Sequence, residues 1–327
     1  MSLFAILFAL LIEQARPLAR SNPVHAGLRL WARWVSRSFD AGKTQHGWVA
    51  WSLTVGAPTL LSAVVYWLLE GFLGWPLAVV WSTVVLYFCL GFRQFSHHFT
   101  AIRDALDAGD EAQARELLAR WQRVEVADLP RSELLRHVIE YSVLAAHRHV
   151  FGVMVCYSTL AALGLGPAGA VLYRLAEFVT RYWAHRGTTQ PVSASLKTVA
   201  ARAWQVIDWV PARATALAFA VVGSFEEAID CWRHHAQRFP NDNDGVVLAA
   251  TSGAINVRLG GEALPSAVVV QGDTTAEAVP GDAQDSESTP GREAEPAHLR
   301  SIVGLVWRSV VLWVVLLALL TLARLLG

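Results

Sequence analysis

Two stretches of this sequence are apolar over lengths that can cross a lipid bilayer. Residues 49–69 contain no charged side chain, and residues 302–323 form a second apolar run that is interrupted only by Arg308. A transmembrane helix needs about 20 mainly apolar residues, since each adds about 1.5 Å against a hydrocarbon core of about 30 Å. Only 17% of the chain is charged, whereas soluble domains carry about 25%. The sequence therefore predicts an all-α, polytopic integral membrane protein.

The amino-terminal third predicts a membrane hairpin and its orientation. A turn at Gly71 to Pro76 separates residues 49–69 from a second uncharged run, Leu77 to Phe92, so both ends of the hairpin lie on one side. Residues 16–43 contain an excess of arginine, and the positive-inside rule places that side in the cytoplasm. Apolar residues recur there at helical spacing, which indicates an amphipathic helix on anionic lipid. The apolar run Leu3 to Ile12 is too short to span and is predicted to be an interfacial or buried helix.

The middle of the chain contains a polar segment followed by apolar segments that are interrupted or short. Residues 93–149 alternate charged and apolar positions, which predicts a helical cytoplasmic domain with breaks near Gly109 and Pro130. The apolar run Val150 to Tyr173 is interrupted by glycines and Pro167, so we expect broken, re-entrant half-helices that line a cavity. Ala214 to Val222 is too short to span and is predicted to be another half-inserted helix.

The carboxyl-terminal third contains a polar segment before the last span. Glu262 to His298 is rich in Pro, Gly, Ser and Thr and holds eight acidic residues against one Arg292, which predicts a disordered linker. The predicted organisation has six parts: interfacial helices (1–48), a transmembrane hairpin (49–92), a helical cytoplasmic domain (93–149), broken membrane helices with the site (150–261), a disordered acidic linker (262–299) and a carboxyl-terminal transmembrane helix (300–327).

Several kinds of chemistry are excluded by composition and spacing. The 27 basic residues equal the 27 acidic ones and form no basic block, so no nucleic-acid partner is predicted. Residues 42–44 resemble the end of a phosphate-binding loop but lack its upstream glycine and strand. Neighbouring histidines are one or two positions apart and share no helix face, so no metal ligand is assigned. The cysteines are predicted to be packing residues: Cys89, Cys156 and Cys231.

Polar clusters beside the broken apolar segments are the candidate functional residues. They are Asp208 with Arg213, Asn241 with Arg258, and Glu140 with Arg174. Arginine beside glycine-rich backbone suits phosphate, because its planar fork binds oxyanions in a bidentate manner and glycine lets a ligand approach the chain. The same residues also fit a second interpretation, in which they are helix caps and ion pairs at the membrane surface. The residues alone leave both interpretations open.

Around these clusters the chain resembles the CobD/CbiB family of cobalamin biosynthesis. The resemblance covers most of the chain outside the acidic linker. The last two of its motifs are the ones most specific to the family. The motifs follow in this order: Asn22-Pro23-Val24, Ala114-Arg115, Gly166-Pro167-Ala168-Gly169-Ala170 with Tyr173-Arg174, Trp209-Val210-Pro211-Ala212-Arg213 with Thr215-Ala216, and Pro240-Asn241 followed by Val257-Arg258-Leu259-Gly260-Gly261.

The resemblance implies a multi-pass enzyme of the bacterial inner membrane. The implied activity is that of adenosylcobinamide-phosphate synthase, a ligase that joins adenosylcobyric acid to aminopropanol phosphate at the expense of ATP. ATP and Mg are implied as cofactors, with the corrinoid, aminopropanol phosphate and membrane lipids as partners. Carried onto this sequence, the resemblance implies catalytic roles for Glu140 and Asp208. It implies ligand binding by four further residues: Arg174, Arg213, Asn241 and Arg258.

The sequence departs from the family pattern at its acidic centre. Aligning the family's Glu-Ser-x-x-Glu-Asn-x-x-Asp run on Glu140 puts Leu144, Ala145 and Arg148 where Glu, Asn and Asp would stand. Glu177 and Thr180 occupy an Asn and an Asp position. The departures at this centre favour an alternative, a non-catalytic regulatory protein similar to the AmpE membrane modulators. Those proteins share the Asp208-Trp209-Val210-Pro211-x-Arg213 stretch but lack the Arg258-Leu259-Gly260-Gly261 ending.

Overall fold

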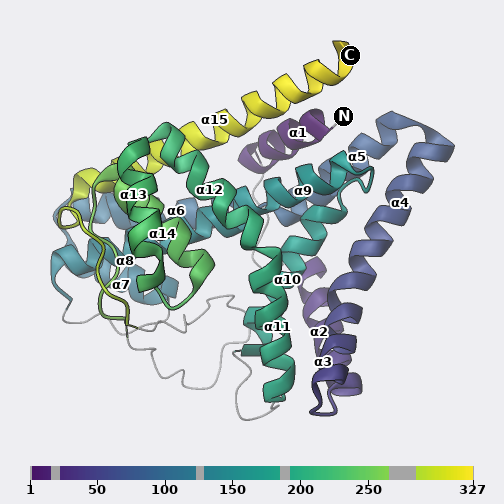
Figure 1. Ribbon diagram of the computed structural model, residues 1–327, viewed down its shortest axis with the longest axis horizontal. Helices are drawn as coiled ribbons and strands as arrows, with labels where there is room; N and C mark the ends of the chain where they lie inside the picture. Colours follow the sequence, from purple (N-terminus) through teal and green to yellow (C-terminus); the bar gives the residue numbers. More distant parts are fainter. Residues whose placement is uncertain (1, 16–22, 123–128, 185–191, 265–284, 327) are drawn as a thin grey trace. The chain divides into compact units, whose positions relative to one another are not determined.

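The computed structural model describes residues 2–15, 23–122, 129–184, 192–264 and 285–326, and every regular element in these ranges is a helix (Figure 1). The chain divides into two compact units, each built from two chain segments. Unit 1 comprises residues 1–91 and 148–211, and unit 2 comprises residues 92–147 and 212–327. Residues 93–147 of the predicted helical domain thus share unit 2 with the carboxyl-terminal third, whereas residues 148 and 149 belong to unit 1.

Unit 1 contains the amino-terminal helices and the interrupted apolar segment. Its helices are α1 (Ser2–Ala15), α2 (Pro23–Phe39), α3 (Thr44–Trp51), the π-helix η1 (Ser52–Gly56), α4 (Ala57–Leu73), α5 (Trp75–Cys89), α9 (Gly152–Ala162), α10 (Ala168–Ala184) and α11 (Ala194–Ile207). Its core joins α2, α3, α10 and α11 through Val35, Ala50, Val179, Trp183 and Leu196, all buried. Small residues allow this close packing, since a Cβ at Gly47 would lie 3.2 Å from Val199 of α11.

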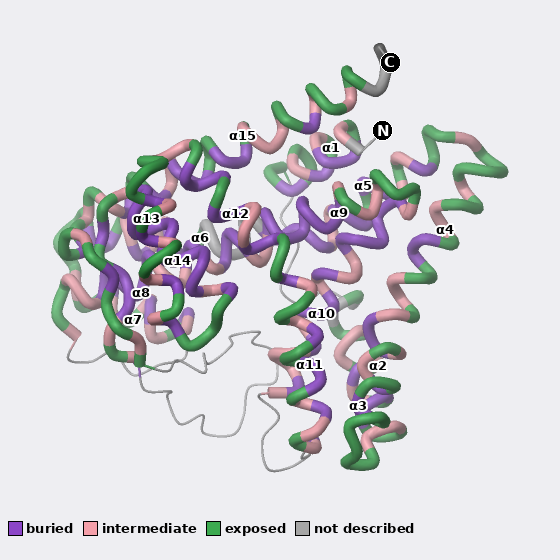
Figure 2. Tube along the Cα trace, in the orientation of Figure 1, coloured by how far each residue is buried: buried purple, intermediate pink, exposed green. Residues whose placement is uncertain are grey.

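Unit 2 is assembled around one buried helix. Its helices are α6 (Phe92–Asp107), α7 (Glu111–Gln122), α8 (Arg131–Ala146), α13 (Phe225–His235), the 3-10 helix η3 (Ala236–Arg238), α14 (Asp242–Ile255) and α15 (Pro296–Leu326). Nearly every residue of α14 is buried, as Figure 2 shows. Gly245 and Gly253 permit this burial, because a Cβ at either would lie about 2 Å from a backbone carbonyl oxygen of Ala236 or Glu227. Helix α12 (Trp209–Val222) begins in unit 1 and continues in unit 2.

Two helical segments are long and apolar enough to cross a membrane. One is Thr44–Leu73, where α3, η1 and α4 are continuous, and the other is Pro296–Ala323 in α15. Helices α11 and α12 qualify together as a third, bent by 44° at their junction. Large apolar side chains on α4 are exposed, among them Leu60, Leu61 and Phe72. Much of α4 is correspondingly coloured as exposed in Figure 2. Such exposure is unfavourable in water and suits lipid, so these helices support a membrane protein.

The turn of the predicted hairpin lies later in the chain than expected, and membrane crossing by both arms stays a prediction. Helix α4 continues through Gly71 to Leu73, and the turn is made by Gly74, whose φ of 84° favours glycine. The second arm, α5, has 15 residues, so it extends only about 22 Å and does not reach spanning length. Helix α1 is likewise a short apolar helix whose Ala5, Ile6 and Ala9 are buried, as the sequence predicted.

The predicted breaks in the middle of the chain are confirmed. Gly109, with φ 79°, separates α6 from α7, and α8 begins directly after Pro130. Helices α9 and α10 are separated at residues 163–167, where Gly164 and Gly166 have φ of 79° and 55°. The Trp67 indole N–H of α4 donates to the Gly164 carbonyl at 2.7 Å. Membrane re-entry at this break stays a prediction.

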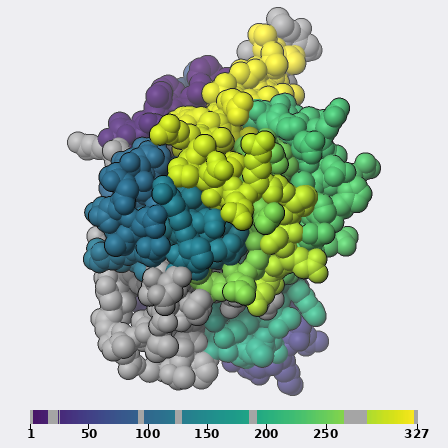
Figure 3. All heavy atoms as spheres, turned by 90° about the vertical axis from the view of Figure 1, so that its left-hand side faces the viewer, coloured from purple at the N-terminus to yellow at the C-terminus, as the bar shows by residue number. Residues whose placement is uncertain are grey.

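The predicted disordered linker is wrong for residues 285–295. Backbone hydrogen bonds fix this stretch against residues 256–261, and Thr289 is 2% exposed. In the space-filling view residues 285–299 lie on the surface against the blue helices α6–α8 of the same unit (Figure 3). Composition predicted disorder, but pairing with a distant backbone segment satisfies the polar groups here. Residues 265–284 of the predicted linker lie outside the described residues, and α15 begins at Pro296, four residues before the predicted boundary.

Candidate functional site

A buried arginine organises the charged face of α8. Glu133, Arg136 and Glu140 are spaced by three and four residues, so they share one face of the helix. The Arg136 Nε and Nη2 atoms donate to Glu133 Oε2 at 2.8 and 2.6 Å, and Nη1 donates to the two Glu140 oxygens at 3.0 and 3.2 Å. The Arg136 side chain is 5% exposed, and a charge so deeply buried needs partners of this kind.

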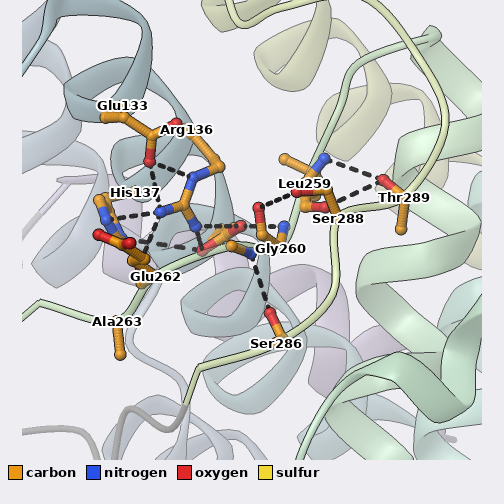
Figure 4. Close-up of polar contacts among 12 residues, drawn as sticks. Glu133, Arg136, His137, Leu259, Gly260, Glu262, Ala263, Ser286, Ser288 and Thr289 are labelled. Carbon is orange, nitrogen blue, oxygen red and sulfur yellow. Dashed lines mark hydrogen bonds and ion pairs between the residues drawn. The ribbon is translucent and has the colours of Figure 1, made fainter.

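The same arginine reaches a chain segment 126 residues away. Arg136 Nη2 donates to the Glu262 carbonyl oxygen at 2.8 Å, and the Gly260 N–H donates to Glu140 Oε1 at 2.7 Å (Figure 4). Gly260 and Gly261 have φ of 82° and 135°, a backbone conformation that glycine adopts without strain. A Cβ at Gly261 would stand 3.4 Å from the Arg136 Cζ atom. These contacts hold the Leu259-Gly260-Gly261 motif on α8.

Residues 286–289 form hydrogen bonds with the Leu259-Gly260-Gly261 motif in addition to those from α8 (Figure 4). The Ser286 N–H donates to the Gly261 carbonyl at 2.9 Å, and the Thr289 N–H donates to the Leu259 carbonyl at 2.7 Å. The Leu259 N–H in turn donates to Thr289 Oγ1 at 2.9 Å. Arg258 has its backbone N–H bonded to the Arg292 carbonyl at 2.7 Å, while the residue itself is exposed. The segment thus presents Arg258 at the surface on a backbone fixed on both sides.

His137 is held as a neutral ring beside this arginine. Its Nε2 atom lies 2.9 Å from Arg136 Nη2, and because a guanidinium only donates, Nε2 must be the acceptor and Nδ1 must carry the proton. Nδ1 lies 3.9 Å from Glu140 Oε2. Burial, followed by the charge of Arg136, lowers the pKa of His137 to about 3. Burial also raises the pKa of Glu140 above its ordinary value, although Arg136 and the Gly260 N–H oppose that shift.

Arg213 and Asn241 both lie near the start of α14. Arg213 of α12 is half-buried, and its Nη1 donates to Asn243 Oδ1 at 3.1 Å. Asn241 is the exposed residue preceding α14, and its Nδ2 lies 3.4 Å from Asp244 Oδ2. Unit 2 therefore contains four of the six predicted site residues: Glu140, Arg213, Asn241 and Arg258.

The other two predicted residues belong to unit 1. Asp208 ends α11 and is fully buried, and its Oδ1 accepts a hydrogen bond of 2.8 Å from the Tyr173 hydroxyl. Arg174 of α10 donates to Glu177 Oε2 at 2.6 Å, and Arg181 Nε lies 3.1 Å from Glu177 Oε1. Convergence of Arg213, Asn241 and Arg258, supported by Asp208 and Glu140, on one anionic ligand stays a prediction. Arg136 was not among the predicted residues, although its spacing from Glu133 and Glu140 was a usable signal.

The carboxylates of Glu140 and Glu177 do not fit a protein-held magnesium ion. Mg²⁺ requires free carboxylate or carbonyl oxygens around it. Here Glu140 is bonded to Arg136 and Glu177 to two arginines, and Arg148 replaces an acid. Within the described ranges, no three His, Cys, Asp or Glu side chains are grouped to hold a metal ion. Both glutamates are therefore already paired with arginine, and Arg148 adds a further cation beside them in the sequence pattern.

Comparison with known proteins gives one family. The family model described as CobD/Cbib protein matches residues 2–289. The cobalamin biosynthesis protein CobD of Stutzerimonas stutzeri is 29% identical over 276 residues, which cover 84% of this chain and 82% of that protein. The protein of the same name from Mycobacterium tuberculosis H37Rv is 30% identical over 248 residues, 74% of this chain and 75% of the relative.

A third relative matches a shorter region. The cobalamin biosynthesis protein CobD of Chromobacterium violaceum is 31% identical over 187 residues, 57% of each chain. No solved structure matches the chain. Because the family model spans nearly the whole sequence, this chain belongs to the CobD/CbiB family.

Proposed function

We propose that this protein acts in cobalamin biosynthesis, at the step that joins adenosylcobyric acid to aminopropanol phosphate. The observation that carries the proposal is the family match over residues 2–289, together with relatives named for cobalamin biosynthesis. The reaction forms an amide between a propionate carboxylate of the corrinoid and the amine. A carboxylate is a poor electrophile, so its oxygen first attacks the γ-phosphate of ATP, which releases ADP and gives an acyl phosphate. The amine then attacks the acyl carbon, loses a proton and displaces phosphate.

The arginines among the candidate residues suit the phosphate groups of these substrates. ATP and aminopropanol phosphate both carry phosphate, and arginine binds phosphate oxygens through a planar fork. Arg258 is exposed on a fixed backbone and Arg213 is half-buried beside Asn243, so these two are the proposed phosphate-binding residues. Glu140 is bonded to Arg136 and Gly260, and Asp208 to Tyr173, so their proposed role is to orient the site. Mg²⁺ would arrive with ATP, because the acids described above do not fit it.

We also propose that the protein is a multi-pass protein of the inner membrane with α6–α8 in the cytoplasm. The apolar helices and the arginine-rich residues before α3 support this orientation. A cysteine at exposed Ala112 should react with a membrane-impermeant maleimide only after the cells are opened. The three native cysteines are buried, which keeps background labelling low. Labelling of Ala112→Cys in intact cells would contradict the orientation.

A non-catalytic role like that of the AmpE membrane modulators is the second candidate. One observation favours it: Glu140 and Glu177 are both paired with arginine, and Arg148 stands where the family pattern has an acid. Such a protein would bind an anionic ligand without converting it.

Complementation separates the two candidates. A strain lacking its adenosylcobinamide-phosphate synthase, supplied with adenosylcobyric acid and aminopropanol phosphate, should regain cobalamin-dependent growth when it expresses this chain. Arg258→Ala should abolish rescue at normal membrane levels, whereas Arg120→Ala, which removes an exposed arginine of α7, should not. Failure of the unaltered chain to rescue at normal levels would favour the regulatory role.

A further inference from the structure

We propose that Arg136 is a positioning residue, which fixes the backbone that presents Arg258 to an anionic substrate. The inference rests on the proposed function for the role of Arg258. The claim that Arg136 fixes the backbone of residues 260–262 does not depend on the proposed function. Arg136 itself lies outside the motifs that carry the family resemblance in this sequence.

The first support is that Arg136 has no capacity left for a ligand. All three of its guanidinium nitrogens are hydrogen-bonded: Nε to Glu133, Nη1 to Glu140, and Nη2 to Glu133, His137 and the Glu262 carbonyl. With five N–H donors committed in this way and 5% of the side chain exposed, the group cannot also bind a phosphate. Its role must therefore be exerted through the groups that it holds.

The groups that Arg136 holds fix the backbone next to Arg258. Every residue from 258 to 262 is held by at least one hydrogen bond, and two of these residues are held by α8. The Gly260 N–H is bound by Glu140, whose carboxylate is oriented by Arg136, and the Glu262 carbonyl is bound by Arg136 directly. Gly260 lies two residues from Arg258. A binding residue whose backbone is fixed in advance loses less freedom when the ligand binds.

The third support is that the chemistry requires arginine. The bonds to Glu133, Glu140 and Glu262 together use all three nitrogens of one guanidinium. An ammonium group has three donors on one nitrogen and cannot span these acceptors. Arg136→Lys therefore keeps the charge, and most of the burial, but loses the bridge to residues 260–262. It is the variant that separates positioning from simple charge pairing.

Hydrogen exchange of the full-length protein in detergent tests the mechanical claim. In Arg136→Lys the amides of Gly260 and Gly261 should exchange at least about tenfold faster, while amides in α14 keep their protection. Glu140→Gln retains an acceptor for the Gly260 N–H and should leave that amide protected more than Glu140→Leu does. Arg120→Lys, an exposed arginine in an ion pair on α7, is the matched control and should change nothing. Unchanged exchange at Gly260 in Arg136→Lys, or equal acceleration throughout unit 2, would overturn the proposal.

A kinetic measurement tests the link to the substrate. For Arg136→Lys protein that remains folded, the KM for aminopropanol phosphate should rise about tenfold, with kcat changed less than threefold. Loss of kcat alone would overturn the positioning role. If the unaltered protein shows no turnover, the proposed function fails, while the exchange result still decides the claim about Arg136.

Discussion

Two clusters of glutamate and arginine, one in each unit, share their charges in opposite ways. In α10 of unit 1, Glu177 is shared by Arg174 and Arg181, which lie one turn before and one turn after it on the same helix. In α8 of unit 2, Arg136 is shared by Glu133 and Glu140 and also bonds a segment 126 residues away. The α10 cluster stabilises one face of a helix, whereas the α8 cluster connects two distant parts of a unit. Similar ion pairs thus have different structural consequences.

The largest difference is expected on removing one arginine from each cluster. Arg136→Met leaves two glutamates without their shared cation and should cost about 3–5 kcal/mol of unfolding free energy. Arg174→Met leaves Glu177 paired with Arg181 and should cost about 1.5–3 kcal/mol, the contribution of one charge-assisted hydrogen bond. Denaturant unfolding of both variants in detergent measures the difference. Equal losses would show that sharing of the arginine is not what distinguishes α8.

Two glycines sharpen the comparison between the units. Gly164 and Gly260 have φ of 79° and 82°, but a Cβ at Gly164 would meet open space, whereas one at Gly260 would lie 2.5 Å from the Glu287 carbonyl oxygen. Gly164→Ala should cost about 1–2 kcal/mol, from the left-handed backbone alone. Gly260→Ala should cost about 1–3 kcal/mol more, because the neighbouring chain must move. If thermal unfolding shows the same loss for both, residues 285–292 do not pack as described.

A pH dependence should be found in the α8 cluster. The pKa of His137 is lowered in the folded protein to about 3 from an ordinary value of 6.5. The stability that this residue contributes is therefore present above pH 6.5 and is lost as the pH falls from 6.5 towards 3. The loss approaches about 1.4 kcal/mol per pH unit within this window.

His137→Gln isolates this contribution. The glutamine amide oxygen can accept from Arg136 without titrating, so the variant should lose less stability between pH 6.5 and 5 than the unaltered protein. Glu140, whose pKa is raised, works in the opposite sense in both proteins and cancels in the comparison. Parallel stability curves for the two proteins would mean that His137 does not titrate in this range.

The smallest effect is expected at a hydrogen bond of unit 1. Trp67→Phe removes the indole N–H that donates to the Gly164 carbonyl at 2.7 Å and keeps an aromatic ring. The loss should be about 0.5–1.5 kcal/mol. Thermal unfolding beside Trp75→Phe, an exposed tryptophan at the start of α5, provides the control. A loss as large as that of Arg136→Met would remove the contrast between local and long-range contacts.

Structural features that depend only on neighbouring residues were predicted best from the sequence. Breaks at Gly109, Pro130 and residues 164–167 were predicted because glycine and proline restrict or release the backbone locally. The helical class also followed from local composition, and the predicted apolar runs 49–69 and 302–323 lie within the segments Thr44–Leu73 and Pro296–Ala323.

Contacts between distant residues were beyond such reasoning. Order in residues 285–295 arises from pairing with residues 256–261, and the acidic composition of the stretch gave the opposite prediction. Glu140 was selected for its family position, but its partners Arg136 and Gly260 come from a helix face and from a segment 120 residues away. Arg258 was predicted as a ligand residue, but the segment of residues 286–292 that fixes its backbone was not predicted to be ordered.

The central claim is that this member of the CobD/CbiB family forms an amide bond. Purified protein in detergent should be incubated with adenosylcobyric acid, aminopropanol phosphate and ATP with Mg²⁺, and the corrinoids analysed by mass spectrometry. We expect adenosylcobinamide phosphate, with one ATP consumed for each amide formed. Folded protein that binds the corrinoid but forms no product, beside an active synthase run in parallel, would contradict the claim and support a regulatory role.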